Sequence, residues 1–104
     1  MAVSIGIETG LARSTERVAL LEAVSDAVRW TVLDVLSHGP QCVCDLQARV
    51  PVPGNLLSYH LKVLREAGLV TASRRGRWVD YAIASDALTR LADALPGVHR
   101  TGEP

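Results

Sequence analysis

The 104-residue sequence contains no phenylalanine, and aromatic residues make up only 4% of the chain. A folded core must therefore be built from leucine, valine, alanine and isoleucine, and the 48% content of hydrophobic residues can supply it. The sequence has no apolar run of the roughly 20 residues that cross a bilayer as a helix, and no basic start ahead of an apolar run. We therefore expect a single small cytoplasmic domain without a membrane segment.

Cysteine is also scarce, because Cys42 and Cys44 are the only two in the sequence. Cysteines one residue apart rarely pair with each other, so a secreted scaffold held by disulfides is not expected. The sequence also lacks a phosphate-binding glycine loop, a paired acid and base, and an activated nucleophile. We therefore expect no enzyme.

The net charge is zero, but the charges are unevenly distributed. Residues 49–78 contain six basic residues and one acid, whereas residues 1–48 and 79–104 each contain more acids than bases. A basic segment between acidic ends favours a surface that binds an anionic partner. The alternative is a solvated face that has no partner.

Hydrophobic periodicity predicts helices in the first half of the chain. Residues 1–10 show no sustained period and are expected to form a flexible arm. The first helix is expected to begin near Leu11 and to run to about Ala23. Ser25 and Asp26 are expected to cap a second helix, which the following His-Gly-Pro run at 38–40 ends.

The middle of the chain predicts two short helices joined by a tight turn. The third helix is expected over about 43–50, and the Pro-Val-Pro-Gly segment at 51–54 forms a rigid turn. Asn55 is expected to cap a fourth helix that ends at Gly68. Its leucines recur at the spacing of a buried stripe, and its opposite face is polar. The leucines are Leu56, Leu57, Leu61 and Leu64, and the polar face carries Ser58, Tyr59, Lys62 and Arg65.

The period changes after this helix, which predicts a hairpin. Residues 69–73 and 77–83 are rich in β-branched and aromatic residues and flank an Arg-Arg-Gly run at 74–76. Ser85 and Asp86 are expected to cap a last helix that ends near Leu95.

The predicted fold is mainly α with a small β-hairpin. The order α-α-α-α-β-β-α corresponds to a winged helix-turn-helix over residues 11–96, with a flexible tail over 97–104.

A polar helix followed by a hairpin with cations at its tip is typical of a protein that binds duplex DNA. Short polar side chains can read base edges while cations hold the phosphates on either side. The candidates for reading bases are Asn55, Ser58, Tyr59 and His60, and the candidates for phosphate are Lys62, Arg65, Arg74, Arg75 and Arg77. His60 can instead pack partly buried against the hairpin, and the hairpin arginines can instead form a solvated turn.

Three runs resemble the ArsR/SmtB family of bacterial metal- and metalloid-responsive regulators. They are Cys-Val-Cys-Asp-Leu at 42–46, Asn-Leu-Leu-Ser-Tyr-His-Leu-Lys-Val-Leu-Arg-Glu-Ala-Gly-Leu-Val at 55–70, and Arg-Gly-Arg-Trp-Val-Asp-Tyr at 75–81. Asp-Ala-Val-Arg at 26–29 resembles the segment that opens the family's second helix, and the resemblance covers about residues 18–95. It implies a homodimer formed by the first and last helices, operator DNA read by the helix over 55–67, and repression that ends when an ion binds.

In arsenic-responsive members, cysteines spaced like Cys42 and Cys44 are thiolate ligands at the start of the third helix. Soft thiolates favour As(III), Sb(III), Cd(II) or Zn(II). Side chains at i and i+2 of a helix point to different faces, so both can bind one ion only if that turn unwinds. Gln47 stands where some members have a third cysteine, which leaves the site incomplete unless His38, the arm or water fills it. The two cysteines can alternatively be small packed hydrophobes or an oxidation switch.

The family's second site, on the last helix, is half present. Asp86 and His99 fit its spacing, but Leu88 and Gly102 replace its other two ligands. Such a half site implies at most weak binding of Ni(II) or Zn(II) across two subunits. Three alternatives stay open: DNA binding that needs no effector, control by a partner protein, and a winged helix that binds protein instead of DNA.

Overall fold

The computed structural model describes residues 2–97, and of residues 2–9 the backbone only. The described elements are α1 (Ala2–Val24), α2 (Ala27–Leu36), β1 (Gln41–Cys42), α3 (Val43–Arg49), α4 (Gly54–Glu66), β2 (Val70–Arg75), β3 (Trp78–Ile83) and α5 (Ala87–Ala94). The predicted winged helix-turn-helix is confirmed, with the short strand β1 as an addition. Among the helices of residues 2–97, none has the length and apolar character to span a membrane.

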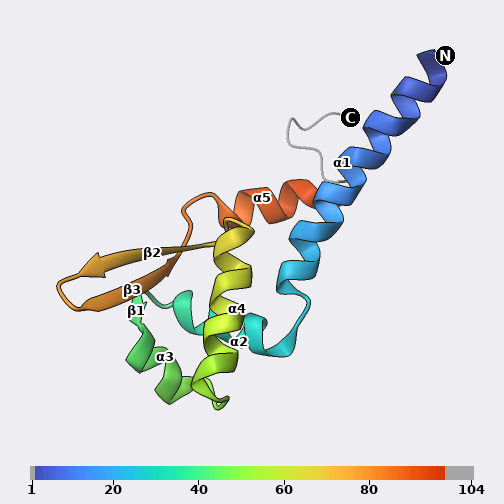
Figure 1. Cartoon of the computed structure of the whole chain (residues 1–104). Helices are drawn as coiled ribbons and strands as arrows, with labels where there is room; N and C mark the ends of the chain where they lie inside the picture. Colours follow the sequence, from blue (N-terminus) through green and yellow to red (C-terminus); the bar gives the residue numbers. More distant parts are fainter. Residues whose placement is uncertain (1, 98–104) are drawn as a thin grey trace.

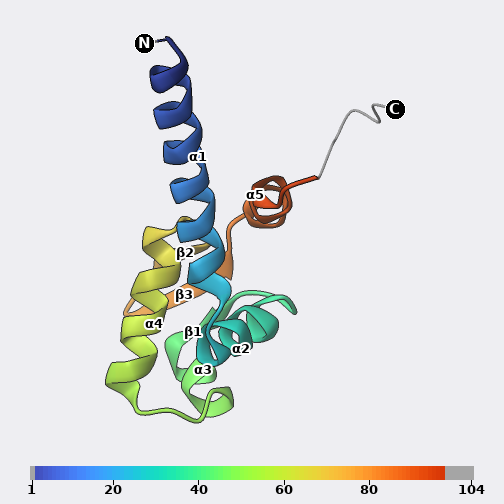
Figure 2. The ribbon, with the colours of Figure 1, turned by 90° about the vertical axis from the view of Figure 1, so that its right-hand side faces the viewer.

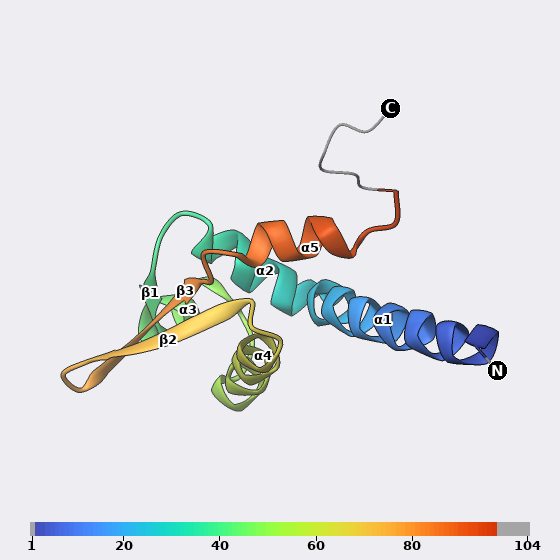
Figure 3. The same cartoon turned by 90° about the horizontal axis from the view of Figure 1, so that it is seen from above.

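Helices α2, α3 and α4 form the body of the molecule, from which the β2/β3 hairpin projects as a wing (Figure 1). The long helix α1 leaves the body beside α4, as the turned view shows (Figure 2). Seen from above, the wing and the free end of α1 extend in opposite directions (Figure 3). Helix α5 follows the wing in the chain and packs against α1. The wing and the helix-turn-helix are therefore on one side of the fold, and α1 and α5 are on the other.

The core is aliphatic, as the absence of phenylalanine predicts. Every buried hydrophobic side chain among the described residues is alanine, valine or leucine, and these come from all five helices and the base of the wing. Helix α4 contributes Leu57, Leu61 and Leu64, each at most 2% exposed. Burial of one such leucine contributes about 1.5–3 kcal/mol, so these three residues fix which face of α4 points inward. Leu56 was expected in the same stripe but is 39% exposed.

The predicted caps have different outcomes at the three helices. Asp26 caps α2 as expected, because its Oδ1 accepts hydrogen bonds from the backbone N–H groups of Val28 (2.8 Å) and Arg29 (3.0 Å). The bond from Arg29 is the main cause of the lowered pKa of the Asp26 carboxyl. The prediction for Asn55 is wrong, because α4 begins at Gly54 directly after Pro53.

Asp86 precedes α5 but makes no side-chain cap, which corrects the corresponding prediction. Its backbone angles are φ −101° and ψ 7°, whereas a capping residue usually has an extended conformation that turns its side chain toward the free N–H groups.

Helix α1 begins at Ala2, nine residues before the start expected near Leu11. The sequence indicated no helix there because its first ten residues lack an apolar stripe. A helix that has nucleated gains one backbone hydrogen bond for each residue added, so it can extend without such a stripe. Whether residues 1–10 act as a flexible arm stays a prediction, and the expected tail over 97–104 lies outside the described residues except for Gly97.

The strands form one antiparallel sheet in the order β1-β3-β2. Gln41 of β1 pairs with Tyr81 of β3, and Cys42 pairs with Asp80. A strand of two residues is too short to show the alternating pattern by which strands are recognised, so the sequence could not predict it. Its consequence is that Cys42 lies beside the middle of β3, and Cys44 follows at the start of α3.

Candidate nucleic-acid interface and cysteine pair

The turn between α3 and α4 is held by a side chain of α3. Gln47 Nε2 donates a hydrogen bond of 2.6 Å to the carbonyl of Val52, in the middle of the proline-containing turn. A Cβ at Gly54 would lie 3.2 Å from Gln47 Oε1, so the first residue of α4 packs closely against the same side chain. Gln47 therefore links α3 to the turn and to the first residue of α4.

Helix α4 presents a polar outer face. Its inner face is buried in the core through its leucines, and the residues of the opposite face are exposed. The exposed predicted residues are Asn55, Ser58, Tyr59, Lys62 and Arg65. Tyr59 is 56% exposed, which leaves its hydroxyl group accessible to a partner. Five of the six site residues predicted on α4 therefore lie where a duplex could reach them.

His60 is the sixth, and the expectation that it faces DNA is wrong. Its side chain is buried, with a residue exposure of only 6%. Its Nδ1 lies 2.9 Å from Nη1 of Arg29, so Nδ1 accepts the bond and the ring proton is on Nε2. The alternative, partial burial against the hairpin, does not apply either, because His60 packs against the start of α2. His60 directly precedes Leu61 in the helix and belongs to its buried face. An imidazole that has a hydrogen-bond partner can be buried there.

Arg29 joins three helices at this point. Its Nε donates to the carbonyl of Ala23 at 2.7 Å and its Nη2 to that of Glu22 at 3.3 Å, both at the end of α1. Its Nη1 contacts His60 of α4. The Asp-Ala-Val-Arg run at 26–29 thus ties α1, α2 and α4 together through its first and last residues.

The wing tip is a two-residue turn made of Gly76 and Arg77, between the paired residues Arg75 and Trp78. Gly76 has a φ of +63°, and no residue other than glycine among those described has a positive φ. A positive φ at the first turn residue alone corresponds to a type II′ turn, whose twist matches that of antiparallel strands. Arg74, Arg75 and Arg77 are all exposed, so the predicted arginine-tipped hairpin is present.

One wing arginine is engaged within the wing. Arg75 Nε lies 2.8 Å from Asp80 Oδ2, and Arg75 Nη2 lies 3.1 Å from Asp80 Oδ1. This bidentate hydrogen bond raises the pKa of Arg75 and lowers that of Asp80. Asp80 could not be singled out from the sequence, because its pairing depends on the register of the two strands. Trp78, next to the tip, is 45% exposed.

The cysteine pair lies where β1 meets α3. Cys42 is the N-cap residue of α3, and its Sγ accepts a hydrogen bond of 3.4 Å from the backbone N–H of Asp45. Cys44 is exposed in the first turn. Partial desolvation raises the pKa of the Cys44 thiol, and the charge of Cys42 and a hydrogen bond to it add to this shift. Because Cys42 is the extended N-cap residue and precedes the helix, the two cysteines are not at i and i+2 of a helical turn, and the expected need to unwind such a turn does not apply.

Neither predicted ion site is complete in the described part of the chain. Across residues 2–97, no three or more His, Cys, Asp or Glu side chains gather so that they could hold a metal ion. At the expected cysteine site, the described residues therefore supply two donors, the thiols of Cys42 and Cys44, and no third protein donor. Asp86 stands at the start of α5, and its predicted partner His99 lies outside the described residues.

A helix-turn-helix followed by a cationic β-wing defines the class of winged helix-turn-helix regulators. The chain matches the arsR family of bacterial regulatory proteins over residues 26–72. It is 34% identical to the arsenical resistance operon repressor of Bacillus subtilis, over 67% of this chain and 68% of that protein. It is 38% identical to the HTH-type transcriptional repressor SmtB of Mycobacterium tuberculosis, over 81% of this chain and 61% of that repressor's length.

Solved structures agree with these relatives. An ArsR-like transcriptional regulator from Rhodococcus sp. RHA1 superposes with a TM-score of 0.70 at 31% identity, over 78% of this chain and 76% of that one. The chain belongs to the ArsR family of bacterial regulatory proteins. The predicted family is thereby confirmed, and it is a family of regulators rather than enzymes.

Proposed function

We propose that this protein is a transcriptional repressor that binds operator DNA through α4 and the wing. The observation that supports this most strongly is the exposed face of α4 with Ser58, Tyr59, Lys62 and Arg65, in a chain whose wing also carries exposed arginines. A helix of this kind enters the major groove, where its short side chains meet base edges and its cations meet phosphates. The wing extends the same contact to neighbouring phosphates. A winged helix that binds protein instead of DNA has no need for cations on both α4 and the wing.

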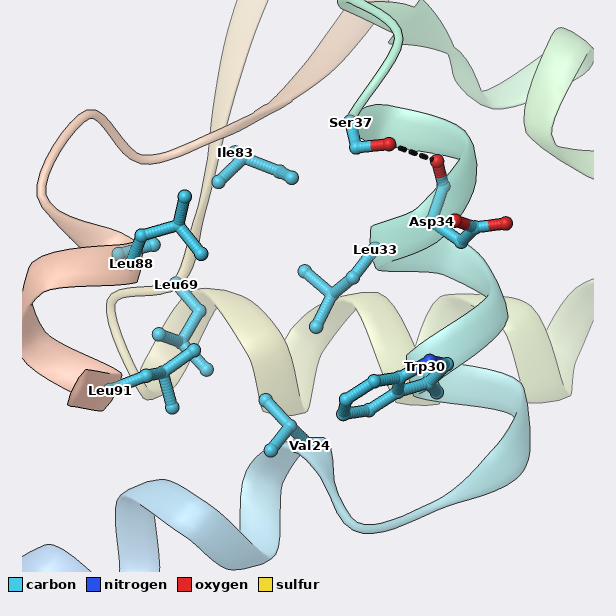
Figure 4. A pocket seen from close by; sticks show the side chains of 10 residues that line it. Val24, Trp30, Leu33, Asp34, Ser37, Leu69, Ile83, Leu88 and Leu91 are labelled. Carbon is cyan, nitrogen blue, oxygen red and sulfur yellow. Dashed lines mark hydrogen bonds between the residues drawn. The ribbon is translucent and has the colours of Figure 1, made fainter. Parts of the chain in front are cut away.

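We further propose that the protein acts as a homodimer through α1 and α5. These two helices and the start of α2 expose large apolar side chains, among them Leu88 at 80% and Trp30 at 62%. Between them lies an apolar groove of about 220 Å³ with Val24, Leu33 and Leu91 in its walls (Figure 4). Exposed apolar surface of this kind marks an interaction site, and a second copy would place two α4 helices on successive turns of a duplex.

The substitution Leu88→Glu tests the dimer and its role in DNA binding. We expect the dissociation constant of the dimer to rise by about thirtyfold or more, because a carboxylate replaces an apolar side chain in the proposed interface. Affinity for a duplex of about 30 base pairs, selected from a random library by the wild-type protein, should fall in parallel. Sedimentation velocity gives the oligomeric state and fluorescence anisotropy gives the affinity.

The matched control is Leu56→Glu, which changes an exposed leucine of α4 away from α1 and α5. It should leave the oligomeric state unchanged. A wild-type protein that sediments as an 11.2 kDa monomer, or a dimeric Leu88→Glu variant, contradicts the proposed dimer.

We propose that a thiophilic ion, As(III) or Sb(III) before Zn(II) or Cd(II), binds Cys42 and Cys44 and releases the DNA. The donor set supports a soft ion, because two thiols, one at the N-cap and one in the first turn of α3, belong to the helix that precedes α4. Water or a residue outside the described range would complete the coordination. The ion would pull on the junction of β1 and α3, at the opposite end of α3 from the turn that Gln47 holds.

Calorimetric titration of the reduced protein with As(III), Zn(II) and Ni(II) tests this site. We expect As(III) to bind one site per chain, and Cys42→Ser or Cys44→Ser to weaken binding at least tenfold, since each removes one of two protein donors. Asp86→Ala is the control and should retain As(III) binding, while it abolishes any binding of Ni(II). If no ion binds, the protein is a regulator controlled by a partner or without an effector.

A further inference from the structure

The outer face of the wing carries a row of three side chains, one from each strand. Cys42 of β1 pairs with Asp80 of β3, which pairs in turn with Ser73 of β2. Side chains at directly paired positions project from the same face of a sheet, and positions two residues along a strand do so too. Arg75 and Trp78 therefore share this face with Asp80. The acid is placed so that it can reach the arginine at the tip.

The contact between Asp80 and Arg75 uses one whole edge of the guanidinium group. Asp80 accepts from Nε at 2.8 Å and from Nη2 at 3.1 Å. The Arg75 side chain is nevertheless 66% exposed, and that of Asp80 is 25% exposed. The pair lies at the surface, where an ion pair contributes little to stability and can exchange its partner. A phosphate group would seek the same edge, because carboxylate and phosphate match the guanidinium fork in the same way.

Among the side chains that the structure describes, the other two wing arginines have no acidic partner. Arg74 Nη1 makes one long contact of 3.4 Å with the carbonyl of Gly76. Within residues 10–97, whose side chains are described, Arg77 has no hydrogen bond or ion pair. The wing thus carries three cations, and one of them, Arg75 of β2, is neutralised by an acid of the neighbouring strand β3.

We propose that Asp80 sets the strength of the wing's contact with DNA by holding Arg75 away from phosphate. Arg74 and Arg77 supply the wing's phosphate contacts, whereas Arg75 binds the Asp80 carboxylate and becomes available to phosphate only when that contact breaks. Asp80 thereby limits the part of the affinity that does not depend on the DNA sequence, because phosphate contacts are made on any duplex. This inference rests on the wing contact of the proposed function.

The test compares Asp80→Asn, Arg75→Ala and the double variant on a random-sequence duplex over a range of salt concentrations. Asp80→Asn should bind about three- to tenfold more tightly, and its log affinity should fall more steeply with log salt by about one, because one more phosphate is neutralised. In the Arg75→Ala background the same change should give no gain beyond about twofold, since the freed arginine is then missing. Asp80→Ser serves as a second variant if the amide disturbs folding, which thermal unfolding reports.

Four outcomes overturn the proposal. Weaker binding by Asp80→Asn means that the acid orients Arg75 toward the phosphate. An equal gain with and without Arg75 means that Asp80 acts only as a negative charge near DNA. Arg77→Ala reports the wing contact separately, because Arg77 has no acidic partner. A loss in Arg77→Ala with no gain in Asp80→Asn overturns the role of Asp80 alone, and no change in either overturns the wing contact as well.

Discussion

Replacing Lys62 and Arg65 of α4 together by alanine should weaken binding to every duplex by about ten- to a hundredfold at moderate salt. Both side chains are exposed on the face of α4 opposite the buried leucines. Each is expected to neutralise a phosphate and to release the counterions bound there. The slope of log affinity against log salt should therefore become shallower by about two. Anisotropy titrations of random and selected duplexes at several salt concentrations give both quantities.

The matched control removes two exposed arginines from α1, Arg13 and Arg17. The net charge changes by the same amount as in the α4 double variant. If sedimentation velocity shows that the control variant still dimerises, equal losses would mean that the whole protein's charge, and not the face of α4, drives binding. Ser58→Ala provides the opposite contrast. It should change the preference among duplexes and leave the salt slope unaltered, because a serine hydroxyl contacts base edges without neutralising a phosphate.

The sequence predicts those parts of the fold that follow from local pattern. The leucine spacing of α4 identified both its buried and its exposed face, and the Pro-Val-Pro-Gly run located the turn before it. The glycine between arginines located the tip of the wing, where the structure has a positive φ. Each of these features is determined by residues within one or two turns of the position concerned.

The features that the sequence did not predict depend on long-range packing. Burial of His60 requires Arg29, 31 residues earlier, to approach its Nδ1. Strand β1 exists because Gln41 and Cys42 pair with β3, the second strand of the hairpin. The pair of Arg75 and Asp80 depends on the register of β2 and β3. A shift of one residue would place the two side chains on opposite faces of the sheet. All three change the expected site: one predicted residue is withdrawn from DNA, the cysteines lie beside the wing, and one wing arginine is paired.

A second link between distant elements joins the end of α4 to α5. Arg90 Nη1 donates to the carbonyl of Gly68 at 2.9 Å, and Arg90 Nη2 donates to that of Ala67 at 3.0 Å. Carbonyls at the end of a helix lack partners within the helix, so the guanidinium group satisfies them and its charge suits the negative end of the helix. The arginine approaches this closely because Gly68 has no Cβ. A Cβ there would lie 2.6 Å from Arg90 Nη1.

Gly68→Ala should therefore lower the free energy of unfolding by about 2–4 kcal/mol, from left-handed backbone strain together with loss of charged hydrogen bonds. The φ of Gly68 is +75°, a region that alanine adopts at a cost, and the new methyl group must displace the guanidinium group. Urea unfolding followed by circular dichroism measures the change. Gly76→Ala is the matched control, because its φ of +63° imposes the same kind of strain while a Cβ there meets no atom within 4 Å. It should cost only the strain, about 1–2 kcal/mol.

The part of the Gly68 effect that comes from Arg90 can be isolated with Arg90→Met, which keeps an apolar stem and removes the donors. In that background Gly68→Ala should cost no more than Gly76→Ala does in the wild-type protein, because no guanidinium group remains to be displaced. An undiminished cost would show that the backbone strain at Gly68 accounts for the whole effect. A reduced cost would show that α5 stabilises the end of α4 through Arg90, so that the helix proposed to read DNA is held in place by the helix proposed to form the dimer.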